Sequence, residues 1–319
     1  MKYPIGIQTF SNIIQDGYVY VDKTDMVYSL ANSGKIFFLS RPRRFGKSLL
    51  LSTLKSYFLG QKELFRGLKI DSLEKEWNVY PVFHLSFGKG IFSMPYELDK
   101  NLETFVAMGE REYGKDELAT TISERFAAVI KAAHKKTGRR AVVLIDEYDK
   151  PLLDVMDQEI FVEDESGNRR KLENYNRELL KGFYGVFKDA DEDLQFVFLT
   201  GVTKFSQVSV FSGFNQPDDI SLDEKYESLC GITKEELLTV FDKPIHSLAA
   251  NKNKSYEDMV AMLTEKYDGY HFSSKMTGIF NPFSILNCFS KNDMRNYWFA
   301  SGTPGYLVRL LAHGNENIN

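Results

Sequence analysis

Gly46, Lys47 and Ser48 follow one another directly after an apolar run and a short basic loop. This triplet suits phosphate chemistry, because the lysine ammonium can reach the β- and γ-phosphates of a nucleotide and the serine hydroxyl can bind Mg²⁺. Backbone N–H groups at the start of a helix supply further donors to phosphate oxygens. The triplet therefore predicts a loop that binds a nucleoside triphosphate.

The flanking segments support this prediction, although Arg41 occupies the first glycine position of the full motif G-x-x-x-x-G-K-[ST]. Residues 36–39 are continuously apolar, as in a strand buried on both faces. After Lys47, apolar residues recur at helical spacing up to Phe58, and Gly60 is typical of a helix end. The alternative is a strand–loop–helix unit with an incidental lysine.

Two adjacent acids form the second candidate group. Asp146 and Glu147 follow the apolar residues 142–145, and ligands gather at the carboxyl ends of strands in a sheet covered on both sides. We predict that Asp146 holds Mg²⁺, directly or through water, with Ser48 as a second metal ligand. Glu147 is predicted to orient and deprotonate the attacking water. Alternatively, the acids only mark the end of a buried strand.

Further polar residues are candidates for contacts with the phosphates. Arg43 and Arg44 can grip phosphate in a bidentate manner, and pairing with acids of a neighbouring loop is an equal alternative. Thr200, which ends another apolar run, is the first candidate for a contact with the γ-phosphate or water, with Thr203 and Lys204 behind it. Capping of the turn by the Thr200 hydroxyl is the alternative.

The candidate residues fall into two sets. Glu147, Lys47 and Thr200 are predicted to act in catalysis. The residues predicted to bind the nucleotide are Arg43, Arg44, Phe45, Gly46, Lys47, Ser48 and Leu49. An adenine ring could stack on Tyr18 or Tyr20, although such an aromatic alternation is more often a half-buried strand.

The elements that must position these residues alternate along the chain. The patterns predict strands near 36–39, 81–87, 141–146 and 194–201, and helices near 96–113, 116–137 and 171–188. Leu118 is expected on the apolar face of the second helix. Such alternation indicates an α/β fold with a parallel sheet covered by helices. From Thr233 and Glu236, which form a capping box, helical segments continue without clear strands. We therefore predict domains at 1–230 and 231–319.

The composition is typical of a globular protein and argues against several other classes. The chain of 319 residues is 43% hydrophobic and 26% charged, as in ordinary globular proteins, and its net charge of −4 argues against a surface built as a whole for nucleic acid. Its two cysteines form neither a disulfide framework nor a zinc site. There is no signal-peptide pattern and no run of membrane-spanning length. We expect a cytoplasmic protein without a membrane partner.

Several motifs together resemble the bacterial AAA-ATPase-like family over essentially the whole chain. They are PIGIQTF, YVYVDKT, RPRRFGKSLLLSTL, DEYDKPL, LTGVTKFS, YDGYHF, NPFSIL and NYWFASGTP. The arginine-rich loop without the first glycine is itself a mark of that family. The resemblance implies an ASCE-type P-loop domain that binds ATP with Mg²⁺, followed by a mostly helical, winged-helix-like lid. Adenine rather than guanine is favoured also because residues 251–254 lack the aspartate of an N-K-x-D element.

The resemblance leaves the partners open. Members of the family often continue into a C-terminal PD-(D/E)xK nuclease-like domain, which we expect to be absent from these 319 residues. The remaining partners considered are further copies of the chain and, without a decision, nucleic acid. The leading hypothesis is a Mg²⁺-dependent ATPase whose turnover drives a lid or oligomer change. The alternative is a nucleotide-gated regulatory module with little hydrolysis, because no trans-acting arginine is identifiable from the sequence.

Overall fold

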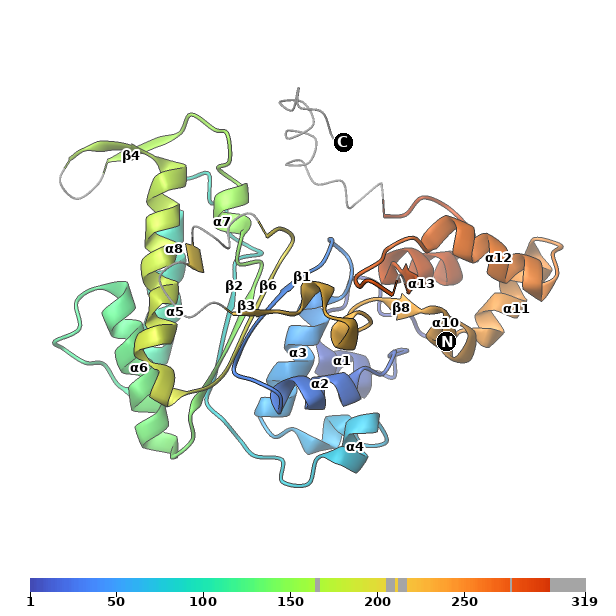
Figure 1. The fold of residues 1–319 in the computed structure, drawn as a ribbon, viewed down its shortest axis with the longest axis horizontal. Helices are drawn as coiled ribbons and strands as arrows, with labels where there is room; N and C mark the ends of the chain where they lie inside the picture. The colour runs from blue at the N-terminus through green and yellow to red at the C-terminus, as the bar shows by residue number, and fades with distance from the viewer. Residues whose placement is uncertain (164–166, 205–209, 212–216, 276, 299–319) are drawn as a thin grey trace.

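Five parallel strands form the central sheet of the structure, a computed structural model that describes residues 1–163, 167–204, 210–211, 217–275 and 277–298 (Figure 1). The order across the sheet is β2–β3–β6–β1–β7. Their bounds are β1 Ile36–Ser40, β2 Val82–Ser86, β3 Ala141–Asp146, β6 Leu194–Gly201 and β7 Asp218–Asp219. The helices that connect them lie on both sides of the sheet, as expected for parallel strands.

The carboxyl ends of the central strands meet at one edge of the sheet. β6 lies between β1 and β3, with Ser40 opposite Gly201 and Ile145 opposite Leu199. β2 pairs with β3 so that Ser86 lies opposite Asp146. This register brings the loop after β1 and the acids after β3 to the same edge.

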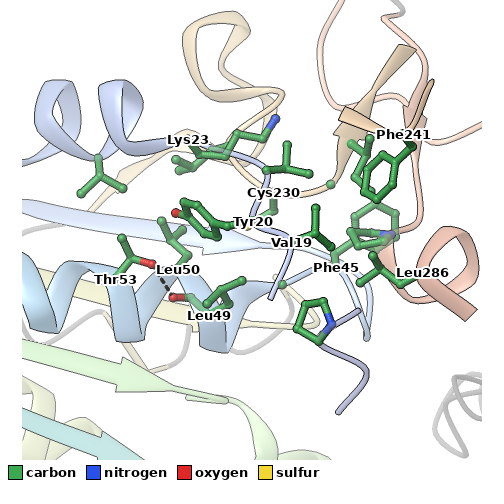
Figure 2. A pocket seen from close by; sticks show the side chains of 18 residues that line it. Val19, Tyr20, Lys23, Phe45, Leu49, Leu50, Thr53, Cys230, Phe241 and Leu286 are labelled. Atoms are coloured by element: carbon green, nitrogen blue, oxygen red, sulfur yellow. Dashed lines mark hydrogen bonds between the residues drawn. The ribbon is translucent and has the colours of Figure 1, made fainter. Parts of the chain in front are cut away.

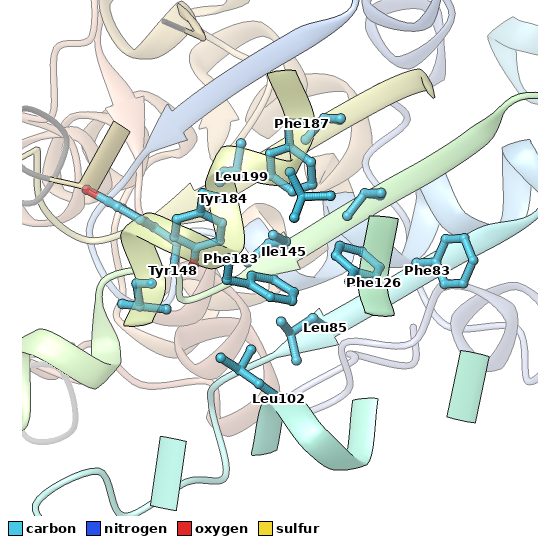
Figure 3. Packing of buried hydrophobic residues seen from close by; sticks show 14 of the residues in the cluster. Phe83, Leu85, Leu102, Phe126, Ile145, Tyr148, Phe183, Tyr184, Phe187 and Leu199 are labelled. Carbon is cyan, nitrogen blue, oxygen red and sulfur yellow. The ribbon is translucent and has the colours of Figure 1, made fainter. Parts of the chain in front are cut away.

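One face of the sheet is covered by three long helices. They are α5 Glu97–Tyr113, α6 Ile122–Thr137 and α8 Leu172–Asp189. Figure 3 shows their aromatic side chains packed against alternate residues of the strands, including Leu85, Ile145 and Leu199. The rings of Phe126 and Phe183 stack at 4.9 Å between centroids. The strands read as nearly continuous apolar runs because both of their faces are buried.

The opposite face carries the helix that follows the phosphate loop. The elements on this side are α1 Phe10–Gln15, α2 Thr24–Ala31, α3 Lys47–Phe58, a 3-10 turn Lys62–Phe65 and α4 Lys69–Leu73. α2 and α3 contribute Leu30, Leu51 and Leu54 to a cluster with Leu39 and Leu144 of the strands.

The rest of the chain adds a hairpin and a helical region. The remaining elements are α7 Lys150–Leu153, β4 Phe161–Glu163, β5 Arg169–Lys171, 3-10 turns Asp191–Asp193, Ile220–Leu222 and Glu224–Tyr226, β8 Ile232–Thr233, α10 Lys234–Val240, α11 Asp242–Asn251, α12 Tyr256–Tyr267, β9 Ile279–Phe280 and α13 Pro282–Lys291. Helices α10–α13 form their own apolar cluster, with Tyr3 and Val19 packed against it. The domain boundary at residue 230 and the winged-helix-like character of the lid stay predictions.

The predicted strands and helices are confirmed except at the start of α6. The region after residue 230, predicted to be helical without clear strands, also contains the antiparallel pair β8–β9. α6 begins at Ile122, so residues 116–121 are not part of it, and Leu118 is 89% exposed. The reason is a capping box, in which the Thr121 hydroxyl accepts from the Glu124 amide and the Glu124 carboxylate accepts from the Thr121 amide. Residues 299–304 of the last family motif and 205–206 of another lie outside the described residues.

Candidate active site

The loop between β1 and α3 presents a helix N-terminus at the sheet edge. Gly46 caps α3 with a φ of 94°, a left-handed conformation that glycine adopts without strain. Arg44 has a φ of 68°, so the turn is tight just before the helix. The first N–H groups of α3 have no partner within the helix, and such groups favour an anion.

Lys47 is buried against its own loop. Its Nζ donates to the carbonyl oxygens of Arg41 (2.8 Å) and Pro42 (3.1 Å), and the residue is 7% exposed. Burial lowers the pKa of Lys47, and the negative charge of Asp146 opposes that change. These two bonds hold the ammonium against its own loop.

Three side chains from separate elements meet beneath the start of α3, and we call them the cleft floor. The Ser48 hydroxyl donates to Oδ2 of Asp146 at 2.6 Å. The Thr200 hydroxyl donates to Oδ1 of Asp146 at 2.7 Å. Asp146 thus links α3, β3 and β6 through its two carboxylate oxygens. The structure brings Ser48 and Asp146, the predicted metal ligands, together with Thr200, the predicted contact to the γ-phosphate or water.

Glu147 lies beside the cleft floor with a different environment. Its φ is 56°, and its carboxyl makes no hydrogen bond or ion pair with another described residue. A Cβ on Gly88, just after β2, would lie 3.6 Å from its Oε2, so the carboxyl faces that segment. Burial raises the pKa of Glu147, the charge of Asp146 adds to the rise, and Lys47 and Arg43 oppose it.

Ser48 and Glu147 line a cleft of about 470 Å³, whereas Asp146 and Thr200 are buried and are not part of its lining. Its lining is Pro4, Ile5, Gly6, Ile7, Gln8, Arg43, Arg44, Gly46, Lys47, Ser48, Leu49, Gly88, Glu147, Lys150, Val202, Pro282, Phe283 and Leu286. We call residues 4–8 together with Pro282, Phe283 and Leu286 the cleft wall. The wall therefore comes from two segments far apart in the sequence, and the phosphate loop and the acids come from the chain between them.

The three arginines of the loop have different surroundings. Arg43 and Arg44 are exposed at the cleft and form no ion pair with any described acid, and the Arg44 guanidinium lies 5.0 Å from the centroid of the Phe283 ring. Arg41 is 1% exposed and donates to the carbonyl oxygens of Ser221 (2.7 Å) and Tyr226 (3.2 Å). The residue at the missing glycine position is thus a buried connection to the segment after β7.

Other candidates lie away from the cleft. The Thr203 hydroxyl donates to Asp149, and Lys204 pairs with Asp219. Neither is among the residues that line the cleft. The Phe45 ring is buried, 4.6 Å from that of Tyr270. Of the predicted nucleotide-binding residues, Phe45 alone contributes no part of the cleft lining.

An apolar cavity of about 100 Å³ adjoins the cleft and shares Pro4, Gly46, Leu49, Pro282 and Leu286 with it. Figure 2 shows it between α3, the segment before α2 and the C-terminal helices, with labelled side chains that include Val19, Tyr20, Phe45, Cys230 and Phe241. Tyr20, one of the two aromatic candidates for stacking, lines this cavity, whereas Tyr18 does not.

Several cleft residues were not anticipated from the sequence. Residues 4–8, Gly88, Lys150 and the start of α13 all line the cleft. Lys150 follows the acids within four residues, so its position offered a signal; its Nζ donates to Gly90 and pairs with Asp154. Residues 4–8 and α13 reach the cleft only through the tertiary fold, and no spacing rule indicates that.

The donor set is compatible with a hard cation. No group of three or more His, Cys, Asp or Glu side chains that could hold a metal occurs in the described part of the chain. A Mg²⁺ ion commonly takes one or two protein oxygens and completes its shell with water and phosphate. Ser48 and Asp146 fit that pattern. Among the described helices, none combines the length and apolar character needed to cross a bilayer.

Comparison with known proteins adds independent findings. A family model described as "Predicted AAA-ATPase" matches residues 4–211. The chain is also 40% identical over 314 residues to a protein of Azotobacter chroococcum mcd 1 described as "Uncharacterized protein in vnfD 5'region". That match covers 97% of this chain and 56% of the relative, so the chain spans little more than half the length of the relative.

Proposed function

The chain belongs to the predicted AAA-ATPase family, whose model covers well over half of it, and on this premise we propose that it binds ATP with Mg²⁺ and hydrolyses it. The cleft floor carries the proposal. A hydroxyl and a carboxylate from two elements meet at 2.6 Å under a helix N-terminus, beside a buried lysine. Oxygen ligands for a cation, N–H donors for an anion and an ammonium are thereby gathered at one edge.

Each polar residue has a proposed role. Lys47 and the first amides of α3 bind the phosphates, and Arg43 and Arg44 add charge at the mouth of the cleft. Ser48 and Asp146 would hold Mg²⁺, which supplies neutralising charge to the phosphates when bound. Glu147 orients the attacking water and accepts its proton. A raised pKa favours that task, because a base acts best when its pKa approaches the working pH.

The apolar cavity beside the cleft is the proposed site for the base. Its lining is mainly aliphatic and aromatic, with few polar side chains. Guanine carries more hydrogen-bonding groups on its edge than adenine, and burying them unpaired costs free energy. This argument supports ATP over GTP.

The C-terminal residues of the cleft wall support a proposed coupling between hydrolysis and the C-terminal helical region. Because Pro282, Phe283 and Leu286 belong to the C-terminal helical region, a nucleotide in the cleft would touch both that region and the phosphate loop. We propose that hydrolysis changes how this region, or a neighbouring copy of the chain, contacts the loop.

Calorimetry and phosphate release test the proposal. The chain is titrated with ATP and GTP, each with and without Mg²⁺, and phosphate release is followed. Lys47→Ala should weaken MgATP binding by about 10- to 100-fold, because a charge-assisted contact contributes roughly 1.5–3 kcal/mol. The exposed Lys62→Ala is the matched control and should bind as the parent does.

The outcomes separate the hypotheses. Tight MgATP binding without phosphate release, even at high protein concentration, would favour the nucleotide-gated module. No heat with either nucleotide would rule out both.

A further inference from the structure

We infer that Asp149 is a positioning residue for the proposed reaction, because it fixes the turn after β6 and, through Thr200, the carboxylate of Asp146. The inference rests on the proposed function of the cleft. Asp149 does not line the cleft, and none of its hydrogen bonds goes to the predicted nucleotide-binding residues. Its action must therefore be indirect.

The carboxylate of Asp149 binds the backbone of the turn directly. Its Oδ2 accepts from the amides of Val202 (3.0 Å) and Thr203 (2.8 Å) and from the Thr203 hydroxyl (2.9 Å). The residue is 1% exposed, so water does not compete for these bonds. A hydrogen bond to a charged group is stronger than a neutral one.

Tyr148 also binds the backbone of this turn, through carbonyl oxygens. Its amide donates to the Thr200 carbonyl at 2.9 Å, and its hydroxyl donates to the Thr203 carbonyl at 3.0 Å. Between them, a Cβ on Gly201 would lie 2.4 Å from the Tyr148 ring and 2.8 Å from Oδ1 of Asp149. The end of β6 therefore approaches residues 148–149 so closely that only glycine fits at position 201.

The turn also positions the carboxylate of Asp146 in the cleft floor. Thr200 begins the fastened segment, and its hydroxyl donates to Oδ1 of Asp146. Asp146 is only three residues before Asp149, so the acid strand is connected to β6 by side chains on both sides of Glu147. If the turn moves, the Asp146 carboxylate loses a bond that sets its orientation.

Burying Asp149 costs more free energy than holding a turn at the surface would. Its Oδ1 has no hydrogen-bond partner in the described structure, and burial raises the pKa of Asp149 against the bonds from Thr203 and Val202. An unpaired buried polar atom destabilises the fold. At the surface, Glu124 accepts from a comparable donor set, the amides of Thr120 and Thr121 and the Thr120 hydroxyl, without that cost.

This resemblance supplies a matched control for the experiment. Asp149→Ala, Asp149→Asn and Glu124→Ala are compared with the parent chain for kcat and KM of ATP hydrolysis, MgATP affinity by calorimetry, and melting temperature. Asp149→Ala should lower kcat by about 10- to 100-fold, because small displacements of reacting groups cost rates of that order, while MgATP affinity changes less than about threefold. Asp149→Asn should recover most of the rate, since its amide oxygen can accept the same bonds. Glu124→Ala should change neither kcat nor affinity.

The results that contradict the inference are distinct from those that contradict the function. If the parent hydrolyses ATP and Asp149→Ala does so at the same rate, the positioning role is wrong. It is also wrong if Asp149→Asn is as slow as Asp149→Ala, or if affinity and rate fall together with stability. If the parent itself does not hydrolyse ATP, the proposed function fails and the inference fails with it.

Discussion

The cleft floor is joined by side-chain hydrogen bonds, whereas the cleft wall is held mainly by apolar packing. In the floor, both carboxylate oxygens of Asp146 accept hydroxyl groups that come from other elements. In the wall, Phe283 and Leu286 pack against the apolar cluster of the C-terminal helices. Directional bonds specify one arrangement, and apolar contacts are non-directional. The groups that need fixed geometry thus lie in the floor, and the surface that can adjust to a ligand lies in the wall.

Glu147→Gln has the largest expected effect and tests the polar side of the cleft, because Glu147 lies directly after Asp146 of the cleft floor. The change keeps size and removes the base, so kcat for ATP hydrolysis should fall by about two to four orders of magnitude while MgATP binding is retained. Phosphate release and calorimetry measure the two quantities. Glu257→Gln, at an exposed position of α12, should leave both unchanged. Hydrolysis at the parent rate by Glu147→Gln would contradict the assignment of Glu147 as the base.

Arg41→Leu tests a third region, the buried connection between the phosphate loop and the segment after β7. The guanidinium lies 4.0 Å from the centroid of the Phe272 ring and binds two buried carbonyl oxygens, of Ser221 and Tyr226. Leaving those oxygens without a donor should lower the free energy of unfolding by about 1–3 kcal/mol, measured by urea denaturation.

The exposed Arg139 provides the control for that substitution. It lies 5.8 Å from the centroid of the Tyr80 ring, and Arg139→Leu should change the free energy of unfolding by no more than about 0.5 kcal/mol. Equal stability of Arg41→Leu and the parent would mean that the buried arginine connects nothing.

Phe283→Ala should give the smallest effect, because it alters only the wall. The ring lies under Arg44, and a cation–π contact at an exposed site contributes about 0.5–1 kcal/mol. MgATP affinity should weaken by about two- to fivefold with kcat unchanged. Phe161→Ala removes a similar contact, to Arg169 at 4.1 Å on the β4–β5 hairpin, and should not alter affinity. A large fall in kcat for Phe283→Ala would contradict the idea that the wall affects binding only.

Local sequence patterns predicted the central strands, and the parallel arrangement of those strands predicted that the cleft-floor residues lie together. Continuous apolar runs identified β1, β3 and β6, because these strands are buried on both faces. Once those strands are parallel, Ser48, Asp146 and Thr200 must approach one edge. The start of α6 was wrong because apolar spacing was followed back to Leu118, past a readable Thr121–Glu124 capping box.

The wall and the arginine network were not predictable in that way. Residues 4–8 and α13 reach the cleft from distant parts of the sequence, and two partners of Arg41, Ser221 and Tyr226, lie 180 and 185 residues away. Contacts at such separation depend on the packing of the C-terminal helices against the sheet, which no local period records. Thr203 was considered for the phosphate because it follows a strand, whereas a buried carboxylate four residues after β3's apolar run turns it inward.

The lysine of the loop already has ligands of its own. The carbonyl oxygens of Arg41 and Pro42 accept from two of the three N–H donors of its ammonium, so an anion that uses more than the remaining donor must displace a carbonyl oxygen. The net gain from the ammonium is then the difference between two sets of bonds. A lone orthophosphate or sulfate offers little beyond that exchange, whereas a ligand that also fills the neighbouring cavity does. A loop of this kind should therefore favour a ligand that fills the cavity over a small inorganic anion.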